Sequence, residues 1–282
     1  MYGNLGMFLQ IVELKTTTAP SMSNPHSHDY YELYFQLEGV RRQLFIKSQV
    51  YDLPAKALCV IPPFCVHQLD GSNYRRININ ISKDLLSEDE LRFLDDCAKS
   101  VALKLDDDFL LFLEPLLVES AELYKSNTFK TKQYSLPLVK TILYFLQNHN
   151  LQAVNISYTQ LSEQVDSLIN KVILFLNENY KSRIDLKMLC EQFFISKATL
   201  CSRFKKRMNC SIMDYLLQLR LGKARSMLFN TNQSIENIAE RCGFSSTNYF
   251  RSIFKEIVGI APLHYRKHMR GEQKNPPQPN DI

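Results

Sequence analysis

The last hundred residues of this 282-residue chain contain one pattern twice, and this repeat limits the possible folds more than any other feature. The pairs that match at a spacing of 49 residues are Leu189-Cys190-Glu191 with Ile238-Ala239-Glu240. The pairs that match at a spacing of 50 residues are Ser202 with Ser252, Phe204 with Phe254, Lys205 with Lys255 and Tyr215 with Tyr265. Because a period of 20–50 residues is typical of a repeated supersecondary unit, we predict two copies of one helical unit.

Each copy is interpreted as a helix, a tight turn and a second helix that small polar capping residues open, at 196–199 and at 245–248. Gly243 suits a left-handed turn in the second copy. Phe194 stands at that place in the first copy, so we expect its turn to be built differently. A long helix at 214–229, with Arg220, Lys223 and Arg225, should set the distance between the copies.

The second helix of each copy has one apolar and one polar face. Leu200 and Phe204 form the apolar stripe of the first copy, and Phe250, Ile253 and Phe254 form that of the second. A helix that packs by one face and exposes polar and basic groups on the other can enter a groove of DNA.

Charge supports a polyanionic partner for this part of the chain. Residues 167–270 contain 18 Lys/Arg and 7 Asp/Glu, although the whole chain has a net charge of only +5. Clustered basic residues are the electrostatic signature of phosphate binding. A plain helical bundle with a basic, solvated surface is the alternative at this stage.

The segment IENIAERCGFSSTNYFRSIFKEIVGIAPLHYRK closely resembles the signature of the AraC/XylS family of transcription regulators. The matching parts are the I-A-x-x-x-G-F start at 238–244, the Y-F-x-x-x-F-K helix at 249–255 and the G-x-x-P-x-x-Y-R ending at 259–266. The linking Y-L-x-x-x-R-L-x-x-A-x-x-x-L pattern also stands at 215–228. The resemblance covers about a hundred residues.

This resemblance implies that both recognition helices enter major grooves on one face of double-stranded DNA. The implied contact residues are Lys197, Ala198, Thr199, Cys201, Ser202, Arg203, Lys205, Lys206, Ser246, Thr247, Asn248, Arg251, Ser252 and Lys255. Lys205, Lys206 and Lys255 are better placed for phosphates. We expect Asn248 and Arg251 to carry most of the base readout, because the first helix offers smaller side chains there.

Arg203 departs from the family pattern, since it occupies a usually apolar position of the first recognition helix. It either turns outward and contacts DNA or distorts the helix packing.

The amino-terminal part has a different texture. Between Tyr30 and Ile81 short β-branched and aromatic runs alternate with turn signals, which predicts β-hairpins. The predicted fold class is α+β, with an effector-binding β domain at 1–82 and amphipathic helices at 83–154. A linker at 155–166, an all-α tandem helix-turn-helix domain at 167–270 and a disordered tail at 271–282 complete the chain.

The β domain contains a cluster of potential metal ligands: His26, His28, Glu32 and His67. The spacings H-x-H-x3-E-x6-G and P-x-F-x2-H resemble the two motifs of the cupin barrels, with Phe64 in place of the usual Gly. The resemblance therefore implies a cupin-like β-barrel that holds a small effector, such as a sugar. The expected pocket residues are His26, His28, Glu32, Tyr34, Arg42 and His67, and alternation along the strands adds Tyr31 and Phe45. By default we expect the protein to bind no cofactor, and a divalent metal ion is the alternative.

The helices at 83–154 offer more apolar surface than one layer on a barrel needs, and related regulators use such a segment to dimerise. We therefore expect a homodimer. RNA polymerase is the expected partner at promoters, and no enzymatic activity is expected. Two other functions stay open: a metal-dependent cupin enzyme fused to a DNA-binding domain, and a constitutive architectural protein.

The seven cysteines are scattered, without zinc-finger spacing, and the amino terminus lacks the pattern of a signal peptide. No apolar run reaches the length of a transmembrane helix. These features predict a cytoplasmic protein without membrane contact.

Overall fold

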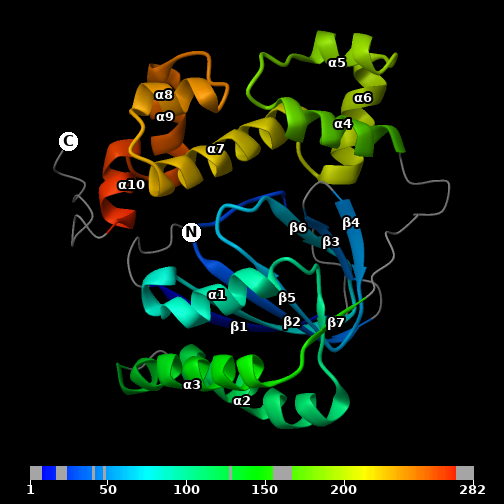
Figure 1. Ribbon diagram of the computed structural model, residues 1–282. Coiled ribbons are helices and arrows are strands. Elements are labelled where there is room, and N and C mark those ends of the chain that lie inside the picture. The colour runs from blue at the N-terminus through cyan, green and yellow to red at the C-terminus, as the bar shows by residue number, and fades with distance from the viewer. Residues whose placement is uncertain are drawn as a thin grey trace.

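A computed structural model describes residues 8–16, 24–39, 42–46, 49–126, 129–154 and 167–270. Figure 1 shows the β-strands in the middle of the molecule, with helices α2 and α3 on one side and α4–α10 on the other. The predicted linker at 155–166 and the predicted tail at 271–282 lie outside the described residues.

The strands form two antiparallel sheets. The six-stranded sheet has the order β1 (Leu9–Thr16), β7 (Tyr74–Ile81), β2 (Tyr31–Gly39), β5 (Ala57–Ile61), β8 (Leu103–Lys104), β9 (Gln152–Ala153). The three-stranded sheet has the order β4 (Gln49–Leu53), β3 (Arg42–Ile46), β6 (His67–Asp70). Strand β1 was not predicted, and the short strands β8 and β9 come from the segment predicted to be helical.

Strict alternation in β7 gives the larger sheet two different faces. Ile77, Ile79 and Ile81 belong to the core that packs under α1–α3, while Asn78 and Asn80 point to the opposite face. Residues of both sheets share a second core on that opposite face, formed by Tyr34, Leu44, Ile46, Tyr51, Leu53, Ala57, Cys59, Ile61 and Ala102. The polar face of β7 is therefore buried between the two sheets.

Three helices cover the outer face of the larger sheet. They are α1 (Glu88–Cys97), α2 (Asp107–Lys125) and α3 (Phe129–Asn148), and the short 3₁₀ turn Lys83–Leu85 precedes them. Ser87 and Glu90 form a reciprocal capping box at the start of α1. These helices confirm the predicted change from strand to helix periodicity after residue 82.

The carboxy-terminal helices are α4 (Ser167–Asn179), α5 (Leu186–Gln192), α6 (Lys197–Met208), α7 (Ile212–Asn230), α8 (Ile235–Arg241), α9 (Thr247–Val258) and α10 (Pro262–Met269). Figure 1 shows α7 running between the α4–α6 group and the α8–α10 group. The α+β fold class is confirmed, with a sheet-rich first part and a helical last part.

The two parts pack directly on each other. Phe45 and Val50 of the smaller sheet belong to the apolar core around Tyr215, with 6.1 Å between the Phe45 and Tyr215 rings. On α7, a Cβ atom added at Gly222 would lie 3.1 Å from the Phe64 carbonyl oxygen and 3.2 Å from Ser27 Oγ. The glycine thus allows the backbone of α7 to approach the amino-terminal loops closely.

No helix among the described residues is both long enough and apolar enough to span a lipid bilayer.

Candidate DNA-binding surface and effector site

The two copies of the repeat have the same helix-turn-helix construction. Ser196 Oγ accepts a hydrogen bond from the backbone N–H of Thr199 at 3.2 Å, and Ser246 Oγ accepts one from that of Tyr249 at 3.1 Å. These bonds satisfy N–H groups at the starts of α6 and α9 that have no partner within the helix. Both second helices are therefore capped as the sequence predicted.

An aromatic pair holds each second helix onto the helix that follows it. The ring centroids of Phe204 and Tyr215 are 5.8 Å apart, and those of Phe254 and Tyr265 are 5.3 Å apart. All four side chains are fully buried. The first half of α7 thus serves the first copy as α10 serves the second.

The turns of the two copies are also alike, so the predicted difference between them is wrong. Gly243 has φ of 78°, and Phe194 adopts the same left-handed region at 52°. The closing hydrogen bonds match as well: Ile195 N–H to Cys190 O at 3.1 Å, and Phe244 N–H to Ala239 O at 3.0 Å. The fold imposes this conformation on Phe194 although it is unfavourable for a bulky residue.

The structure places the predicted DNA-contacting residues on the outer faces of α6 and α9. All of them are exposed except Cys201 and Thr247, which are half-buried. Arg203 is among the exposed residues, and the buried stripe of α6 consists of Leu200, Phe204 and Met208. Of the two alternatives for Arg203, the outward orientation is the one observed, and the helix packing is not distorted.

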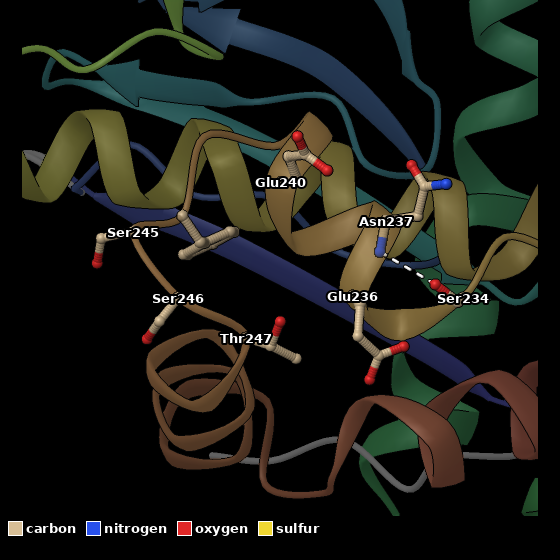
Figure 2. Close-up of a pocket in the computed structure, with 8 residues that line it drawn as sticks. Ser234, Glu236, Asn237, Glu240, Ser245, Ser246 and Thr247 are labelled. Atoms are coloured by element: carbon tan, nitrogen blue, oxygen red, sulfur yellow. Dashed lines mark hydrogen bonds between the residues drawn. The ribbon is translucent and has the colours of Figure 1, made fainter.

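Arg251, the main predicted base reader, is ion-paired in this structure. Its Nη2 donates to Glu236 Oε1 at 2.6 Å. Glu236 and Glu240 line a hollow of about 460 Å³ between α8 and the start of α9, together with Ser246 and Thr247 (Figure 2). The second recognition helix therefore faces an acidic hollow of its own domain.

Two arginines of α7 have structural partners. Arg220 donates to the carbonyl oxygens of Tyr180 and Ser182, both at 2.8 Å. Arg225, which is 9% exposed, donates to the Ser27 carbonyl oxygen at 2.9 Å and also to the Ser27 hydroxyl group. Arg225 thus links the DNA-binding part to the loop between His26 and His28.

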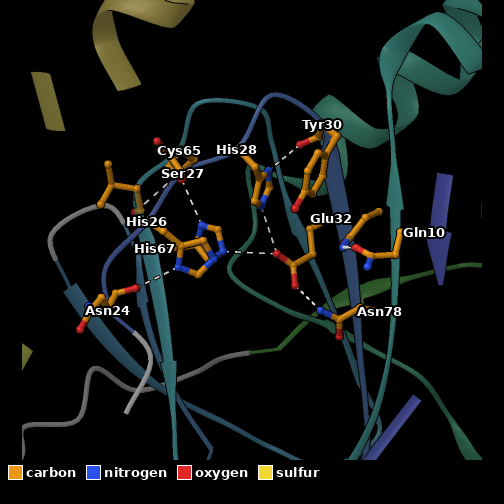
Figure 3. Close-up of polar contacts among 12 residues, drawn as sticks. Gln10, Asn24, His26, Ser27, His28, Tyr30, Glu32, Cys65, His67 and Asn78 are labelled. Carbon is orange, nitrogen blue, oxygen red and sulfur yellow. Dashed lines mark hydrogen bonds and ion pairs between the residues drawn. The ribbon is translucent and has the colours of Figure 1, made fainter. Parts of the chain in front are cut away.

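That loop begins the histidine cluster of the amino-terminal part (Figure 3). Glu32 Oε2 lies 3.1 Å from His28 Nε2 and 3.3 Å from His67 Nε2, and all three side chains are buried. The Asn78 side-chain amide donates to the other oxygen of Glu32. His28, Glu32 and His67 offer ligand atoms within 4.8 Å of one another, whereas His26 is outside this group.

The second ring nitrogens of these histidines fix their tautomers. His28 Nδ1 lies 2.8 Å from the Tyr30 carbonyl oxygen, and His67 Nδ1 lies 3.1 Å from that of Cys65. A carbonyl oxygen only accepts, so each Nδ1 carries a hydrogen and each neutral ring presents a lone pair at Nε2. Two lone pairs and a carboxylate oxygen then converge, which requires a proton or a cation between them.

Burial and charge act against each other at this cluster. Burial lowers the pKa of His28, although the hydrogen bond to Glu32 opposes this shift. For Glu32, burial would raise the pKa, but the close contacts with His28 and His67 outweigh it and hold the pKa well below its ordinary value. The donor set fits a divalent transition metal ion, since histidines that bind metals commonly donate their other N–H to a backbone carbonyl.

The remaining predicted pocket residues divide between the two faces of the strands. Tyr34 and Arg42 lie between the sheets, where Arg42 Nε donates to Tyr34 Oη at 2.9 Å. The prediction for Tyr31 is wrong, because Tyr31 packs under α1 and donates to Asp95 at 2.7 Å. Phe45 is also misplaced, since it faces the carboxy-terminal helices.

Three residues between the sheets escaped the sequence interpretation: Gln36, Arg76 and Asn78. Gln36 and Asn78 are buried, and Asn78 lies beside Glu32. The alternation in YRRININI was a sufficient signal, because the isoleucines identify one face of the strand and leave the arginine and asparagines on the other.

Comparisons with known proteins agree with this construction. Residues 189–268 match the helix-turn-helix domain family. The HTH-type transcriptional activator RhaR of Mannheimia succiniciproducens is 29% identical over 165 residues, which are 58% of this chain and 58% of that protein. RhaS of Escherichia fergusonii, also named a transcriptional activator, is 23% identical over 262 residues, which are 86% of this chain and 87% of that protein.

Among solved structures, ToxT from Vibrio cholerae aligns with 93% of this chain and 98% of its own, at 13% identity and a TM-score of 0.36. In the sequence comparisons, the chain spans a little over half the length of RhaR and most of the length of RhaS.

These relatives are named activators of transcription, which agrees with the predicted role as a regulator. The two helix-turn-helix units joined by α7 therefore form a DNA-binding domain of the AraC type, and the chain is similar to transcription regulators of the AraC/XylS family.

Proposed function

We propose that the protein binds operator DNA through α6 and α9 together, and that a small-molecule effector between its two sheets controls this binding. One observation carries the proposal: two helix-turn-helix units of the same construction are joined by one continuous helix, α7, and both expose a polar face. Such a pair fits successive major grooves on one side of a duplex.

The two recognition helices differ in what they can read. Asn248 and Arg251 of α9 carry side chains that can pair bidentately with adenine and guanine, whereas α6 presents Ala198, Cys201 and Ser202. Lys205, Lys206 and Lys255 supply phosphate contacts that carry no sequence information. We therefore assign most of the specificity to the second unit and more of the anchoring to the first.

Fluorescence anisotropy with operator variants tests this assignment. Arg251→Ala should remove the preference at one base position, which corresponds to roughly 1–3 kcal/mol of discrimination. Lys255→Ala should weaken binding to all sequences alike and reduce the salt dependence by about one charge. If both variants lose affinity equally and base preference stays intact, the assignment fails.

The effector is proposed to act through the contact between the two parts of the chain. The loop that carries His26 and His28 binds Arg225 of α7, and the Phe64 backbone lies against Gly222 of the same helix. A ligand that shifts this loop changes the free energy of docking, and a ligand can control DNA binding only by such a differential interaction. Promoter activity that no small molecule alters would favour the architectural alternative.

A homodimer is proposed to form through α2 and α3. Leu111 is 80% exposed, and Phe112, Tyr134 and Tyr144 are also exposed on these helices. Sedimentation equilibrium should give a dimer for the full chain and a shift toward monomer for Leu111→Glu. Lys104→Glu, an exposed site outside these helices, is the control for an added negative charge. The proposed partner at promoters is RNA polymerase.

A divalent metal ion is the second candidate ligand of the amino-terminal part, because of the three converging ligand atoms of His28, Glu32 and His67. Elemental analysis of the purified chain tests it. Stoichiometric metal in the wild type that disappears in His28→Ala would support the ion. Equal, substoichiometric metal in both proteins would exclude it.

A further inference from the structure

The buried inner face of the larger sheet carries a ladder of polar side chains. Glu32, Tyr34 and Gln36 of β2 stand directly opposite Asn80, Asn78 and Arg76 of β7. Side chains at directly opposed positions share a face of the sheet. The ladder therefore begins at the histidine cluster and ends, four residues further along β7, at Arg76.

Two guanidinium groups meet at the far end of this ladder. Arg42 of β3, which is 5% exposed, donates through Nε to Tyr34 Oη and through Nη1 to the Gly71 carbonyl oxygen at 3.0 Å. The Arg76 guanidinium lies 5.6 Å from the centroid of the Tyr34 ring. The two cations thus approach the same phenol from different sheets.

Neither guanidinium has a counter-ion in the described parts of the chain, where no carboxylate oxygen lies within ion-pair distance of Arg42 or Arg76. The Nε and Nη1 atoms of Arg76 are buried and have no hydrogen-bond partner among the described residues. Water can satisfy the N–H groups, but it does not neutralise the charge, and a charge whose donor atoms are buried without a counter-ion destabilises the fold.

The residue before Arg76, Arg75, shows that the lack of a counter-ion is confined to the inner face of the sheet. Arg75 points to the opposite side of the same strand, where it is ion-paired with Glu13 at 2.8 Å and also with Glu114. Two adjacent arginines of β7 therefore differ in one respect that matters: the outer one has carboxylates and the inner one does not.

We propose that Arg42 and Arg76, with the hydroxyl group of Tyr34 between them, bind the anionic group of the effector, a carboxylate or a phosphate. This inference rests on the proposed function, since it requires a small molecule between the sheets. The other end of the ladder offers acceptors, namely Glu32 and the Asn78 and Asn80 side-chain oxygens, of which the last two have no partner among the residues that the structure describes. Acceptors at one end and guanidinium groups at the other fit a hydroxylated organic anion, such as a sugar acid or a sugar phosphate.

The span of the ladder is consistent with a ligand of this size. Four residues of an extended strand cover about 13 Å between Cα atoms. Asn78 lies only two residues from Arg76, about 7 Å between Cα atoms, so a six-carbon sugar acid bound at the arginines can also reach the nearer acceptors. Guanidinium groups bind carboxylate and phosphate through paired N–H donors, which fixes the orientation of the ligand.

The first test compares the thermal stability of the full chain with that of Arg76→Met and Arg75→Met in chloride buffer. Arg76→Met should melt above the wild type by about 2–4 °C, because it removes an unpaired charge and keeps a side chain of similar length. Arg75→Met should melt below the wild type, since it leaves Glu13 and Glu114 without their partner. A lower melting temperature for both variants would overturn the inference.

The second test adds probes at constant ionic strength: glucuronate, glucose 6-phosphate, inorganic phosphate and, as the neutral control, glucose. Glucuronate or a phosphate should raise the melting temperature of the wild type and of Arg75→Met saturably, and should leave that of Arg76→Met unchanged. A preference for glucuronate assigns a carboxylate, and a preference for the phosphates assigns a phosphate. Equal rises in all three proteins, or no rise with any anion, would overturn the inference.

Operator binding by Arg76→Met separates this inference from the proposed function. If Arg76→Met without ligand binds the operator with wild-type affinity, and anions do not change its melting temperature, then the substitution has removed ligand recognition and left DNA binding intact. If the wild type itself shows no specific operator binding, the proposed function is contradicted, whether or not anions raise the melting temperature.

Discussion

Arg251 reaches the candidate DNA interface already paired with Glu236, and contact with guanine requires that this pair opens. Both side chains are about half exposed, so water screens the pair and its contribution to stability is small. Glu236→Gln should therefore strengthen operator binding about two- to fivefold in an anisotropy titration. Glu240→Gln, which removes a charge from the same hollow without touching Arg251, is the matched control. A gain of the same size in both variants would mean that general repulsion of phosphates, and not the ion pair, is responsible.

His28 gives the amino-terminal part a specific dependence on pH. Because burial lowers its pKa, the unfolded chain binds a proton below about pH 6.5 while the folded chain still resists it, so stability falls with decreasing pH. Glu32 stays ionised over this range, since its pKa is held below its ordinary value of 4.5. Between pH 7 and pH 5, with chelator present, the wild type should lose at most about 2 kcal/mol more than His28→Gln. Parallel pH profiles of the melting temperature would contradict this expectation.

Single residues were predictable from the sequence where a local rule decides their position. Helix capping rules predict Ser196 and Ser246 at the helix starts. Helix periodicity predicts that Phe204 and Phe254 are buried and that the basic side chains of the recognition helices are exposed. The pairing of Arg251 with Glu236 was not predictable, because it depends on the angle at which α8 and α9 meet.

The helix-turn-helix element shows how tertiary structure overrides local preference. Phe194 stands in a left-handed turn and is 97% exposed, so its side chain gains no burial in return for the unfavourable backbone. The sequence predicted a different turn there, since propensity alone gives no reason for a phenylalanine to adopt this conformation. The common packing of α5 on α6 and α8 on α9 determines both turns.

Opposite substitutions in the two turns should thus have opposite effects. Phe194→Gly should raise the stability of the chain by up to about 1 kcal/mol, because glycine adopts the left-handed region without strain. Gly243→Ala should lower stability by about 2–4 kcal/mol, since its Cβ atom would lie 2.4 Å from the Tyr180 carbonyl oxygen. Denaturant unfolding followed by circular dichroism measures both. A destabilised Phe194→Gly would show that the phenylalanine side chain has a stabilising contact in solution.

The strands were predictable as elements, but their partners were not. Turn residues located β2, β5 and β7 well, whereas β1 has no turn signal of its own and is defined only by its pairing with β7. The prediction that Tyr31 and Phe45 line the pocket was wrong for a similar reason. Alternation identifies the two faces of a strand but does not say which face the helices cover.

At the scale of the molecule, the sheet-rich amino-terminal part and the DNA-binding part form one packed unit. Phe45 and Val50 join the core of the first helix-turn-helix unit, and Phe64 packs against that of the second. Sequence composition predicted two parts of opposite charge, but it could not predict that both helix-turn-helix units touch the amino-terminal part.

Calorimetry should detect this coupling. The wild type is expected to unfold in a single cooperative transition, because the two parts share apolar cores. Arg225→Ala combined with Gly222→Val removes the contact to Ser27 and forces a side chain into the close contact at α7, so two separate transitions should appear. Lys223→Val, at an exposed position of the same helix, should keep the single transition. Two transitions in the wild type would show that the parts melt independently.

The close approach at Gly222 limits how this protein can be recombined. A chimera that joins these sheets to the DNA-binding part of another regulator would place a different helix against Ser27 and Phe64, and any side chain larger than hydrogen would enter that contact. Fusions with a boundary before residue 167 are thus expected to respond poorly to their inducer. Chimeras that keep α7 together with the sheets, and exchange only helices α8–α10, should retain the response and acquire a new operator half-site.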